Sequence, residues 1–330
     1  MKRFLVVGTG SIGTRHARNL LALGHEVSGW DAEAGRLADA CRAVPGLRAA
    51  AGLEPGLAAR PDAVLVCTPP AAHVAVAKQA VEAGSHLFVE KPVAHVSDEV
   101  PTLLDTAKRA GRLVLVGFNL RFLPSLRRVK ALLDAGRIGR VHSAHAFFGF
   151  HLPAWRSGRS YADNYAVSAA QGGGVLLDVI HEVDYLGWLF GQAAELVCAA
   201  GHVSALSGDT EDLAEVTLRF ASGAIGHLHV DYLRRAYRRD LEVIGAEGVI
   251  AWDYALRSVR VLGPEPDRVE LHDGAADGPN EAMYVNEMRH LVACLEGREE
   301  PLVDGWEALR SLHMVEAAKR STAERRWVGL

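Results

Sequence analysis

The first 120 residues alternate between short apolar runs and longer stretches in which apolar residues recur with helical spacing. The runs are rich in Val and Leu, which predicts strands that are buried on both faces. The stretches between them end at glycines, as helices commonly do. This alternation predicts a doubly wound parallel sheet with helices on both faces. We expect strands at residues 4–7, 25–31, 62–70, 86–90 and 112–118, and helices at 14–24, 71–84 and 97–111.

The pattern changes after about residue 120. Longer segments follow in which apolar and polar residues alternate, and these are typical of an antiparallel sheet with one buried face. The chain is therefore expected to be an α/β protein with a doubly wound domain at 1–120 and an α+β domain at 121–330. We expect strands at 140–150, 195–205, 213–223, 224–233, 239–248, 249–254 and 257–263, and helices at 124–136, 286–297 and 307–322.

Composition narrows the class of protein. The length of 330 residues fits two domains of about 150 residues each. The net charge of −4 offers no basic field, so we expect no nucleic-acid partner. No apolar run reaches the roughly 18 residues of a membrane span, and the run Phe4–Val7 is too short for a signal peptide. The four cysteines are widely spaced, which fits a reducing compartment, and we expect the cytoplasm.

A glycine motif follows the first expected strand. Residues 8–13 read "GTGSIG" and open the first expected helix, which is the context of a dinucleotide-binding loop. Asp31 ends the second strand, where an acid can hydrogen-bond a ribose hydroxyl and repel a 2′-phosphate. We therefore expect NAD rather than NADP, although Arg36 leaves NADP open. The candidate cofactor contacts here are Gly8, Gly10, Ser11, Ile12, Gly13 and Asp31.

Three further strand ends carry polar or turn residues. They are "CTPPAAH" at 67–73, "VEKP" at 89–92 and "GFNLRF" at 117–122. Each alone reads as a loop, but ligands of open parallel sheets bind beyond the carboxyl ends of the strands, so the three together favour a site. The candidate cofactor contacts are Thr68, Pro69, His73, Glu90, Lys91 and Asn119, and Arg121 is placed at the boundary with a substrate.

A second polar cluster is expected within "GGGVLLDVIHEVDYLGWLFG", residues 172–191. If residues 175–190 form one helix, Asp178, His181, Glu182 and Tyr185 share a stripe about 100° wide on an otherwise apolar surface. Such a stripe faces either a cleft or a hydrogen-bonded core network.

The loop before that helix offers groups suited to a polyhydroxylated ring, namely Trp155, Arg156, Tyr161, Asp163 and Asn164. The alternatives for this loop are plain surface or a subunit contact. The run "RRAYRRD" at 234–240 could bind a phosphate or the nucleotide part of an activated sugar, but we favour a solvated strand end. The histidine pairs in "HSAH" and "HLH" lack a third ligand in the sequence, so we expect no metal.

The motifs "GTGSIG", "CTPPAAH", "VEKP" and "GFNLRF", in this order and followed by "GGGVLLDVIHEVD", resemble the glucose–fructose oxidoreductase / inositol dehydrogenase / MocA family. The resemblance covers nearly the whole chain. It implies a Rossmann domain, a second domain with a large, open, mostly antiparallel sheet, and homodimers or homotetramers. It also implies that Lys91 lies beside the nicotinamide and precedes a cis peptide bond. Asp178 and His181 are implied to lie near the nicotinamide and Lys91. Asp178 and His181 are three residues apart, whereas a separation of four residues is commoner in the family.

The resemblance implies hydride transfer between NAD(P) and a secondary alcohol of a sugar, cyclitol or nucleotide-linked sugar. His181 is expected to act as the base, Lys91 to polarise the oxygen and Asp178 to orient the pair, with Lys91 remaining open as the main proton acceptor. The substrate contacts are Lys91, Arg121, Trp155, Arg156, Tyr161, Asp178 and His181. The alternatives are an NAD-dependent glycoside hydrolase with transient oxidation and a non-catalytic NAD-binding sensor.

Overall fold

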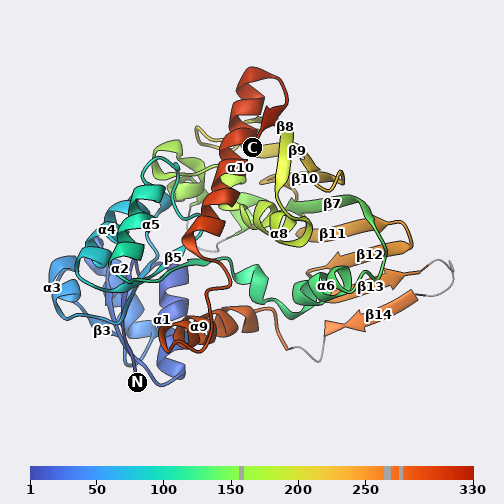
Figure 1. The fold of residues 1–330 in the computed structure, drawn as a ribbon. Helices are drawn as coiled ribbons and strands as arrows, with labels where there is room; N and C mark the ends of the chain where they lie inside the picture. Colours follow the sequence, from blue (N-terminus) through green and yellow to red (C-terminus); the bar gives the residue numbers. More distant parts are fainter. Residues whose placement is uncertain (156–159, 264–268, 275–277) are drawn as a thin grey trace. The chain divides into compact units, whose positions relative to one another are not determined.

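The computed structural model describes residues 1–155, 160–263, 269–274 and 278–330. These residues form two compact units (Figure 1). The first contains residues 1–119 and 283–310, and the second contains residues 120–282 and 311–330.

A six-stranded parallel sheet forms the centre of the first unit, with the strand order β3-β2-β1-β4-β5-β6. This is the order of a classical dinucleotide-binding sheet, in which the direction of the winding reverses between β1 and β4. Its strands are β1 (Arg3–Val7), β2 (Glu26–Trp30), β3 (Arg48–Ala49), β4 (Ala63–Val66), β5 (His86–Glu90) and β6 (Val114–Gly117). Its helices are α1 (Ser11–Ala22), α2 (Ala34–Ala43), α3 (Leu53–Ala58), α4 (His73–Glu82), α5 (Val100–Arg109) and α9 (Ala282–Leu295).

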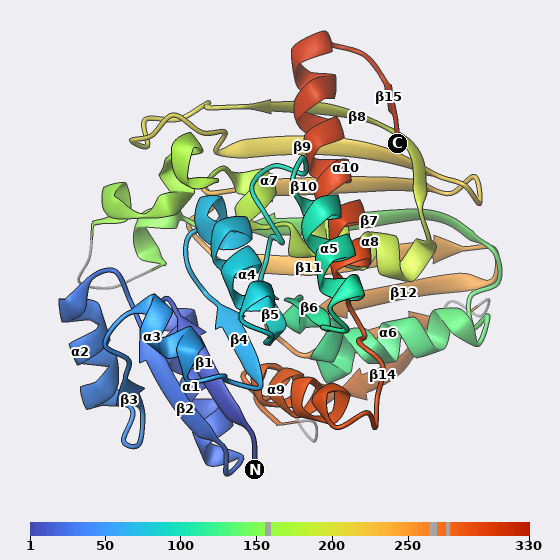
Figure 2. The ribbon, with the colours of Figure 1, turned by 60° about the vertical axis from the view of Figure 1, so that its left-hand side comes forward.

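Alternate side chains of β1 enter two different layers. Phe4 and Val6 belong to a buried cluster with residues of α1, α2 and α9, whereas Leu5 contacts the α3 glycine Gly56. On the sheet's flank α4 and α5 lie side by side (Figures 1 and 2). The continuous apolar runs in the sequence therefore correspond to strands covered on both faces, as expected.

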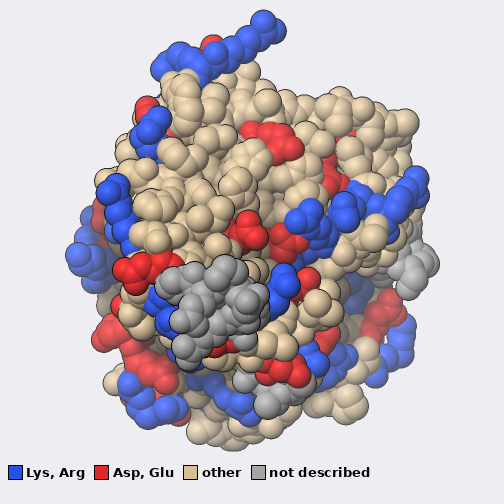
Figure 3. Space-filling model, turned by 90° about the vertical axis from the view of Figure 1, so that its right-hand side faces the viewer, with Lys and Arg blue, Asp and Glu red and all other residues tan. Residues whose placement is uncertain are grey.

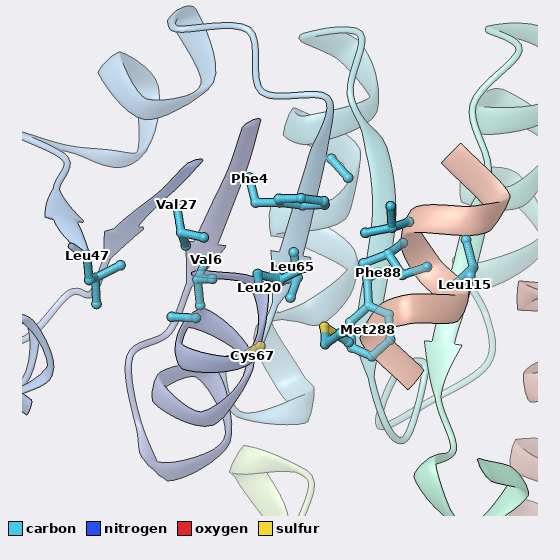
Figure 4. Packing of buried hydrophobic residues seen from close by; sticks show 14 of the residues in the cluster. Phe4, Val6, Leu20, Val27, Leu47, Leu65, Cys67, Phe88, Leu115 and Met288 are labelled. Carbon is cyan, nitrogen blue, oxygen red and sulfur yellow. The ribbon is translucent and has the colours of Figure 1, made fainter. Parts of the chain in front are cut away.

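The return of residues 283–310 to the first unit was not expected, because the sequence assigned everything after residue 120 to the second domain. Met288 and Leu291 of α9 are fully buried and join Phe88 of β5 in one cluster (Figure 4). The Val116 N–H also donates to the Val303 carbonyl, at 3.1 Å. Residues 283–310 thus complete the core over β5 and β6.

A nine-stranded sheet forms the centre of the second unit, with the order β14-β13-β12-β11-β7-β10-β9-β8-β15. Neighbouring strands are antiparallel except β7 and β10, which are parallel. The strands are β7 (Val141–Gly149), β8 (Ala193–Gly201), β9 (Leu213–Phe220), β10 (Ile225–Asp231), β11 (Arg238–Gly245), β12 (Gly248–Asp253), β13 (Ser258–Leu262), β14 (Val269–Asp273) and β15 (Val328–Gly329). The helices are α6 (Pro124–Asp134), α7 (Val175–Asp178), α8 (His181–Phe190) and α10 (Gly305–Glu324), which begins in the first unit.

The alternating pattern of the sequence gives this sheet two unlike faces. Ala144, Ala146 and Phe148 of β7 are buried, and α6, α7 and α8 pack on the sheet. His145 and Phe147 of the same strand line a hollow of about 910 Å³ on the other face. The alternation therefore predicted the buried face correctly.

The helix expected over residues 175–190 is interrupted. The helix α7 ends at Asp178 and α8 begins at His181, with Val179 at φ −103° and ψ 28° between them. Val179 and Ile180 are β-branched, which weakens a helix locally. The argument that placed Asp178 and His181 on one continuous stripe is therefore wrong.

Within the described ranges, no helix is long and apolar enough to cross a membrane. No three of their His, Cys, Asp or Glu side chains are grouped to hold a metal ion. On the face drawn in Figure 3, Lys and Arg side chains lie among Asp and Glu side chains, so that face does not present a field of one sign.

Candidate active site

The glycine loop follows β1 and closes tightly. Gly8 has φ +94°, and a Cβ at this position would lie 2.5 Å from the Cys67 carbonyl oxygen. A Cβ on Gly13 would collide with the Gly8 carbonyl oxygen, whereas nothing lies within 4 Å of one placed on Gly10. Gly10 precedes α1 and supplies no side-chain cap. The first turn of α1 therefore offers backbone N–H groups beside open space, which suits a phosphate group.

Asp31 lies immediately after β2 and is buried. Its Oδ2 accepts a hydrogen bond from the Thr9 N–H at 2.8 Å, and its Oδ1 accepts one from the Glu33 N–H at 2.9 Å. The carboxylate thus fixes the glycine loop as well as placing a negative charge at the end of β2. Arg36 donates to Glu33 at 2.7 Å.

Two polar atoms at the ends of β4 and β6 fit a bound dinucleotide. Thr68 Oγ1 and Asn119 Oδ1 are buried and have no hydrogen-bond partner within the described part of the chain. Buried polar atoms are nearly always paired in a working protein. Together with the space at Gly10, these atoms are the features that a bound NAD would satisfy. Pro69 is exposed, as are the side chain of Ser11 and, in part, that of Ile12.

Lys91 follows β5, and the Lys91–Pro92 peptide bond is cis, as the family resemblance implied. The Glu90 carboxylate lies 2.6 Å from Nε2 of His16 on α1, and its Oε2 accepts the Lys91 N–H at 3.2 Å. His73, the first residue of α4, lies with Nδ1 2.8 Å from the Pro92 carbonyl oxygen and Nε2 2.8 Å from that of Thr68. Burial lowers the pKa of His73 more than these two carbonyls raise it.

Sequence reasoning missed a buried acid beside this turn. Glu287 of α9 is 2% exposed, and neither carboxyl oxygen has a hydrogen-bond partner among the described residues. Burial, with a contribution from the charge of Glu90, raises its pKa well above the ordinary value. Glu287 therefore keeps its proton to a higher pH than an exposed carboxyl group does. The only signal in the sequence was a charged residue on an apolar helix.

Asp178 is held by two tyrosines in the second unit. Tyr165 donates to Oδ1 at 2.5 Å and Tyr232 donates to Oδ2 at 3.2 Å. Burial and the nearby charge of Asp178 raise the pKa of Tyr232, so its hydroxyl keeps the proton that it donates. Trp155 stands edge-on to the Tyr232 ring, with centroids 5.4 Å apart. An aromatic wall thus adjoins the carboxylate.

Two other residues of the expected polar stripe make buried contacts within the second unit. Glu182 of α8 is fully buried and forms an ion pair with Arg239 of β11 at 2.7 Å. Tyr185 is also buried and meets the Trp252 ring edge-on. His181 begins α8 and is half-buried. Of the four stripe residues, Glu182 and Tyr185 therefore belong to a core network, which was the alternative to a cleft.

Arg121 requires a correction. Its guanidinium donates two hydrogen bonds, each 2.8 Å, to Asp184 of α8, and both side chains are 2% exposed. A guanidinium committed to a buried carboxylate is part of the domain's structure, so we remove Arg121 from the substrate ligands. The Tyr161 hydroxyl bonds to Ser207, which ties the two loops together. Arg156 lies outside the described residues.

The structure thus brings together the expected cofactor residues along one edge of the first sheet, at the carboxyl ends of β1, β2, β4, β5 and β6. In the second unit it places Trp155 against Tyr232, which donates a hydrogen bond to Asp178. It adds His16, Glu287, Tyr165, Tyr232 and Arg239, which sequence reasoning did not single out. Tyr165 lay in a segment already suspected of binding substrate, and nothing in the sequence pointed to Tyr232. Arg239 belongs to the run that was read as a solvated strand end, and for this residue that reading is wrong, because its side chain is 10% exposed and pairs with Glu182.

Comparisons with known proteins identify the family of the chain. Residues 2–118 match the sequence model of the oxidoreductase family with an NAD-binding Rossmann fold, and residues 126–251 match that of the GFO/IDH/MocA C-terminal domain. The myo-inositol 2-dehydrogenase of Thermotoga maritima is 31% identical over 99% of this chain and 98% of its own length. The inositol 2-dehydrogenase of Rhizobium meliloti is 28% identical over 99% of both chains.

Solved structures show the same fold over the whole chain. GenD2 from gentamicin A biosynthesis, solved in complex with NAD, has a TM-score of 0.86 at 27% identity and covers 100% of this chain and 96% of its own. Two family models that together span most of the chain, and a relative above 30% identity over its full length, leave one assignment: the chain belongs to the GFO/IDH/MocA family of oxidoreductases.

Proposed function

We propose that this protein is an NAD-dependent dehydrogenase that oxidises a secondary alcohol of a sugar, cyclitol or nucleotide-linked sugar. The observation that carries the proposal is the carboxyl edge of the first sheet, where the glycine loop, Thr68 Oγ1 and Lys91 follow neighbouring strands. Relatives that match nearly the whole chain are named inositol 2-dehydrogenases, which supports a polyol substrate.

NAD is the preferred cofactor because Asp31 places a buried carboxylate at the end of β2. That charge favours a ribose with a free 2′-hydroxyl and repels a 2′-phosphate. Arg36, the nearby cation that a 2′-phosphate would require, is engaged by Glu33. A titration should give a dissociation constant for NAD⁺ at least about tenfold below that for NADP⁺, which corresponds to about 1.4 kcal/mol.

The bound nicotinamide supplies the acceptor for the hydride. The protein must hold the alcohol and take its proton. We propose that His181 accepts this proton at a ring nitrogen and that the Lys91 ammonium donates a hydrogen bond to the alcohol oxygen. Asp178 orients the reacting groups, and the two tyrosine hydroxyls fix its carboxylate. The Trp155 ring supplies an apolar surface for the carbon face of the sugar or cyclitol.

The test is a substrate screen that follows the absorbance of the reduced nicotinamide. Purified protein meets NAD⁺ or NADP⁺ with cyclitols, free sugars, sugar acids and nucleotide sugars. We expect a signal with one class, and a loss of about 10²-fold or more in kcat for Lys91→Ala and for His181→Ala. Lys78→Ala is the matched control, because Lys78 forms a surface ion pair with Glu99 on the same unit.

Two other outcomes would replace the proposal. Release of the aglycone from an aryl glycoside without net reduction of NAD⁺ would indicate a hydrolase that oxidises its substrate transiently. Activity on no substrate, together with Lys91→Ala and His181→Ala variants that differ from the wild type only in partner binding, would indicate a sensor.

We also propose that the first unit binds the cofactor, that the second binds the substrate, and that the protein is a homodimer or homotetramer. All four cysteines are free, which fits the cytoplasm as the proposed location. Light scattering that gives a monomer mass would contradict the assembly.

A further inference from the structure

Lys91 lies in a turn, and the residue on each side of it contacts a buried histidine. Glu90 precedes it and is contacted by His16, and Pro92 follows it and is contacted by His73. The two histidines are 0% and 1% exposed. Neither is accessible enough to touch a substrate, so any part that they play in the reaction proceeds through another group.

His16 links the turn to the glycine loop. It lies on α1, the helix that starts at Gly10. Its Nε2 is 2.6 Å from Glu90 Oε1, and Glu90 Oε2 accepts the backbone N–H of Lys91. The ring is also fixed edge-on against Phe88, with centroids 5.2 Å apart. A displacement of α1 therefore acts on the Lys91 backbone through one buried carboxylate.

His73 links the turn to the loop that follows β4. Its two ring nitrogens each lie 2.8 Å from a carbonyl oxygen, one of Pro92 and the other of Thr68. Thr68 is also the residue whose hydroxyl lacks a partner within the described ranges. The same imidazole thus joins the peptide after Lys91 to a loop that is expected to contact the cofactor.

We propose that His16 and His73 are positioning residues that tie Lys91 to the two loops flanking the cofactor, so that binding of NAD sets the place of the Lys91 ammonium. This proposal rests on the proposed function. Its physical basis is that a chain of buried hydrogen bonds admits few alternative geometries. Both loops and the lysine turn then move as one body, although they come from three separate segments of the chain.

The test measures how NAD⁺ changes the chemical labelling of Lys91. Trinitrobenzenesulfonate modifies the ε-amino groups, and peptide mass spectrometry gives the labelling rate of Lys91 with and without saturating NAD⁺. In the wild type we expect NAD⁺ to slow the labelling of Lys91 by about fivefold, the equivalent of one hydrogen bond of about 1 kcal/mol. Lys78 supplies the internal reference, and its labelling should not respond to NAD⁺.

Two near-isosteric variants of His73 separate positioning from simple structural support. His73→Asn keeps a donor where Nδ1 meets Pro92, and His73→Gln keeps one where Nε2 meets Thr68. Because the link needs both contacts, positioning predicts that each variant still binds NAD⁺ but loses the protection of Lys91. A purely structural role predicts instead that a variant that folds and binds NAD⁺ keeps the protection, since each variant preserves one of the two contacts of His73.

His16 is tested in the same way. His16→Gln keeps a donor toward Glu90 and should preserve the protection, whereas His16→Leu should abolish it. The control is His86→Leu, since His86 accepts a hydrogen bond from the Leu113 N–H at the opposite end of β5. In kinetics we expect His73→Gln and His16→Leu to lower kcat by about 10–100-fold with the KM of the alcohol nearly unchanged.

The outcomes separate the two proposals. If His73→Asn and His73→Gln bind NAD⁺ and keep the protection of Lys91, the positioning role is wrong while the dehydrogenase stands. If NAD⁺ binds the wild type and leaves the labelling of Lys91 unchanged, both the positioning role and the placement of Lys91 at the cofactor are wrong. Because labelling requires no substrate, the result does not depend on having found the right alcohol.

Discussion

At the scale of single residues, the conformation of the glycine loop depends on how closely the neighbouring backbone approaches it. Gly8 combines a positive φ with a close approach to the Cys67 carbonyl, while Gly24 at the end of α1 has φ +84° and nothing within 4 Å of a Cβ. An alanine at either glycine would therefore carry the energetic cost of a left-handed backbone, but only at Gly8 would its Cβ collide with neighbouring atoms. Comparing the two substitutions isolates the effect of that collision on the cofactor site.

We predict that Gly8→Ala abolishes measurable NAD⁺ binding and that Gly24→Ala leaves it intact. Both variants should lose about 1–2 kcal/mol of unfolding free energy from the left-handed backbone, and Gly8→Ala should lose more because the loop must open. Calorimetric titration with NAD⁺ and urea unfolding measure the two effects. Equal NAD⁺ affinity in the two variants would show that the close approach at Gly8 does not shape the cofactor site.

The buried Glu287 carboxyl group should make the free energy of unfolding depend on pH. Because its pKa is raised in the folded protein, the folded state holds a proton that the unfolded state releases above about pH 4.5. The free energy of unfolding must therefore fall as the pH rises from there toward the folded pKa. Replacing Glu287 by Gln removes this penalty. The variant should gain little at pH 5 and on the order of 1–3 kcal/mol at pH 8.

The measurement is the Tm of both proteins across that range. The exposed Glu281→Gln variant is the control, since it removes the same charge from the surface. A gain for Glu287→Gln that is the same at pH 5 and pH 8 would mean that Glu287 is ionised in the folded protein.

At the scale of elements, α8 is fixed by buried ion pairs. Asp184 accepts two hydrogen bonds from Arg121 and a third from Ser311 of α10 at 3.3 Å. Two residues earlier, Glu182 forms an ion pair with Arg239, whose guanidinium also lies over the Phe148 ring. His181 begins this helix, so these contacts determine where its ring is held.

We predict that Arg121→Met lowers the unfolding free energy by about 3–5 kcal/mol, because it leaves the Asp184 carboxylate buried and unpaired. Arg121→Met combined with Asp184→Leu should recover most of that loss. Arg137→Met, which breaks an exposed pair with Glu270, should cost less than about 1 kcal/mol. If Arg121 bound the substrate, the double variant would regain stability and still show a raised KM, which would contradict our reassignment.

At the scale of the whole molecule, the chain returns to its first domain after completing most of the second. Met288, Leu291 and Val292 of α9 are buried in the first unit. A fully buried side chain of this size contributes about 1.5–3 kcal/mol. Three of them approach the net stability of a whole domain, about 5–15 kcal/mol.

We therefore predict that a fragment of residues 1–120 does not unfold cooperatively. A second fragment, in which residues 1–119 are joined by a flexible linker to residues 283–310, should unfold cooperatively and bind NAD⁺. Circular dichroism during heating distinguishes them. A cooperative transition at the same Tm in both fragments would show that α9 is dispensable for the first unit.

The sequence pattern predicted the elements whose conformation depends mainly on residues close by in the sequence. The apolar runs identified β1, β4, β5 and β6, and the glycine spacing identified the loop before α1. The sequence could not indicate that α9 joins Phe88 or that Tyr232 reaches Asp178 across 54 positions, because such contacts depend on the path of the folded chain. The break at Val179 was missed because a helical wheel assumes a continuous helix.

The central claim is that a hydride passes directly from the carbon of an alcohol to NAD⁺. The most direct measurement uses the alcohol identified in the screen, labelled with deuterium at the oxidised carbon, and mass spectrometry of both products. The account predicts that the deuterium appears in the reduced nicotinamide, one label for each ketone formed, and that Lys91→Ala and His181→Ala lower its rate of transfer. Deuterium that returns to the sugar or exchanges with water, with no labelled cofactor, would contradict the account.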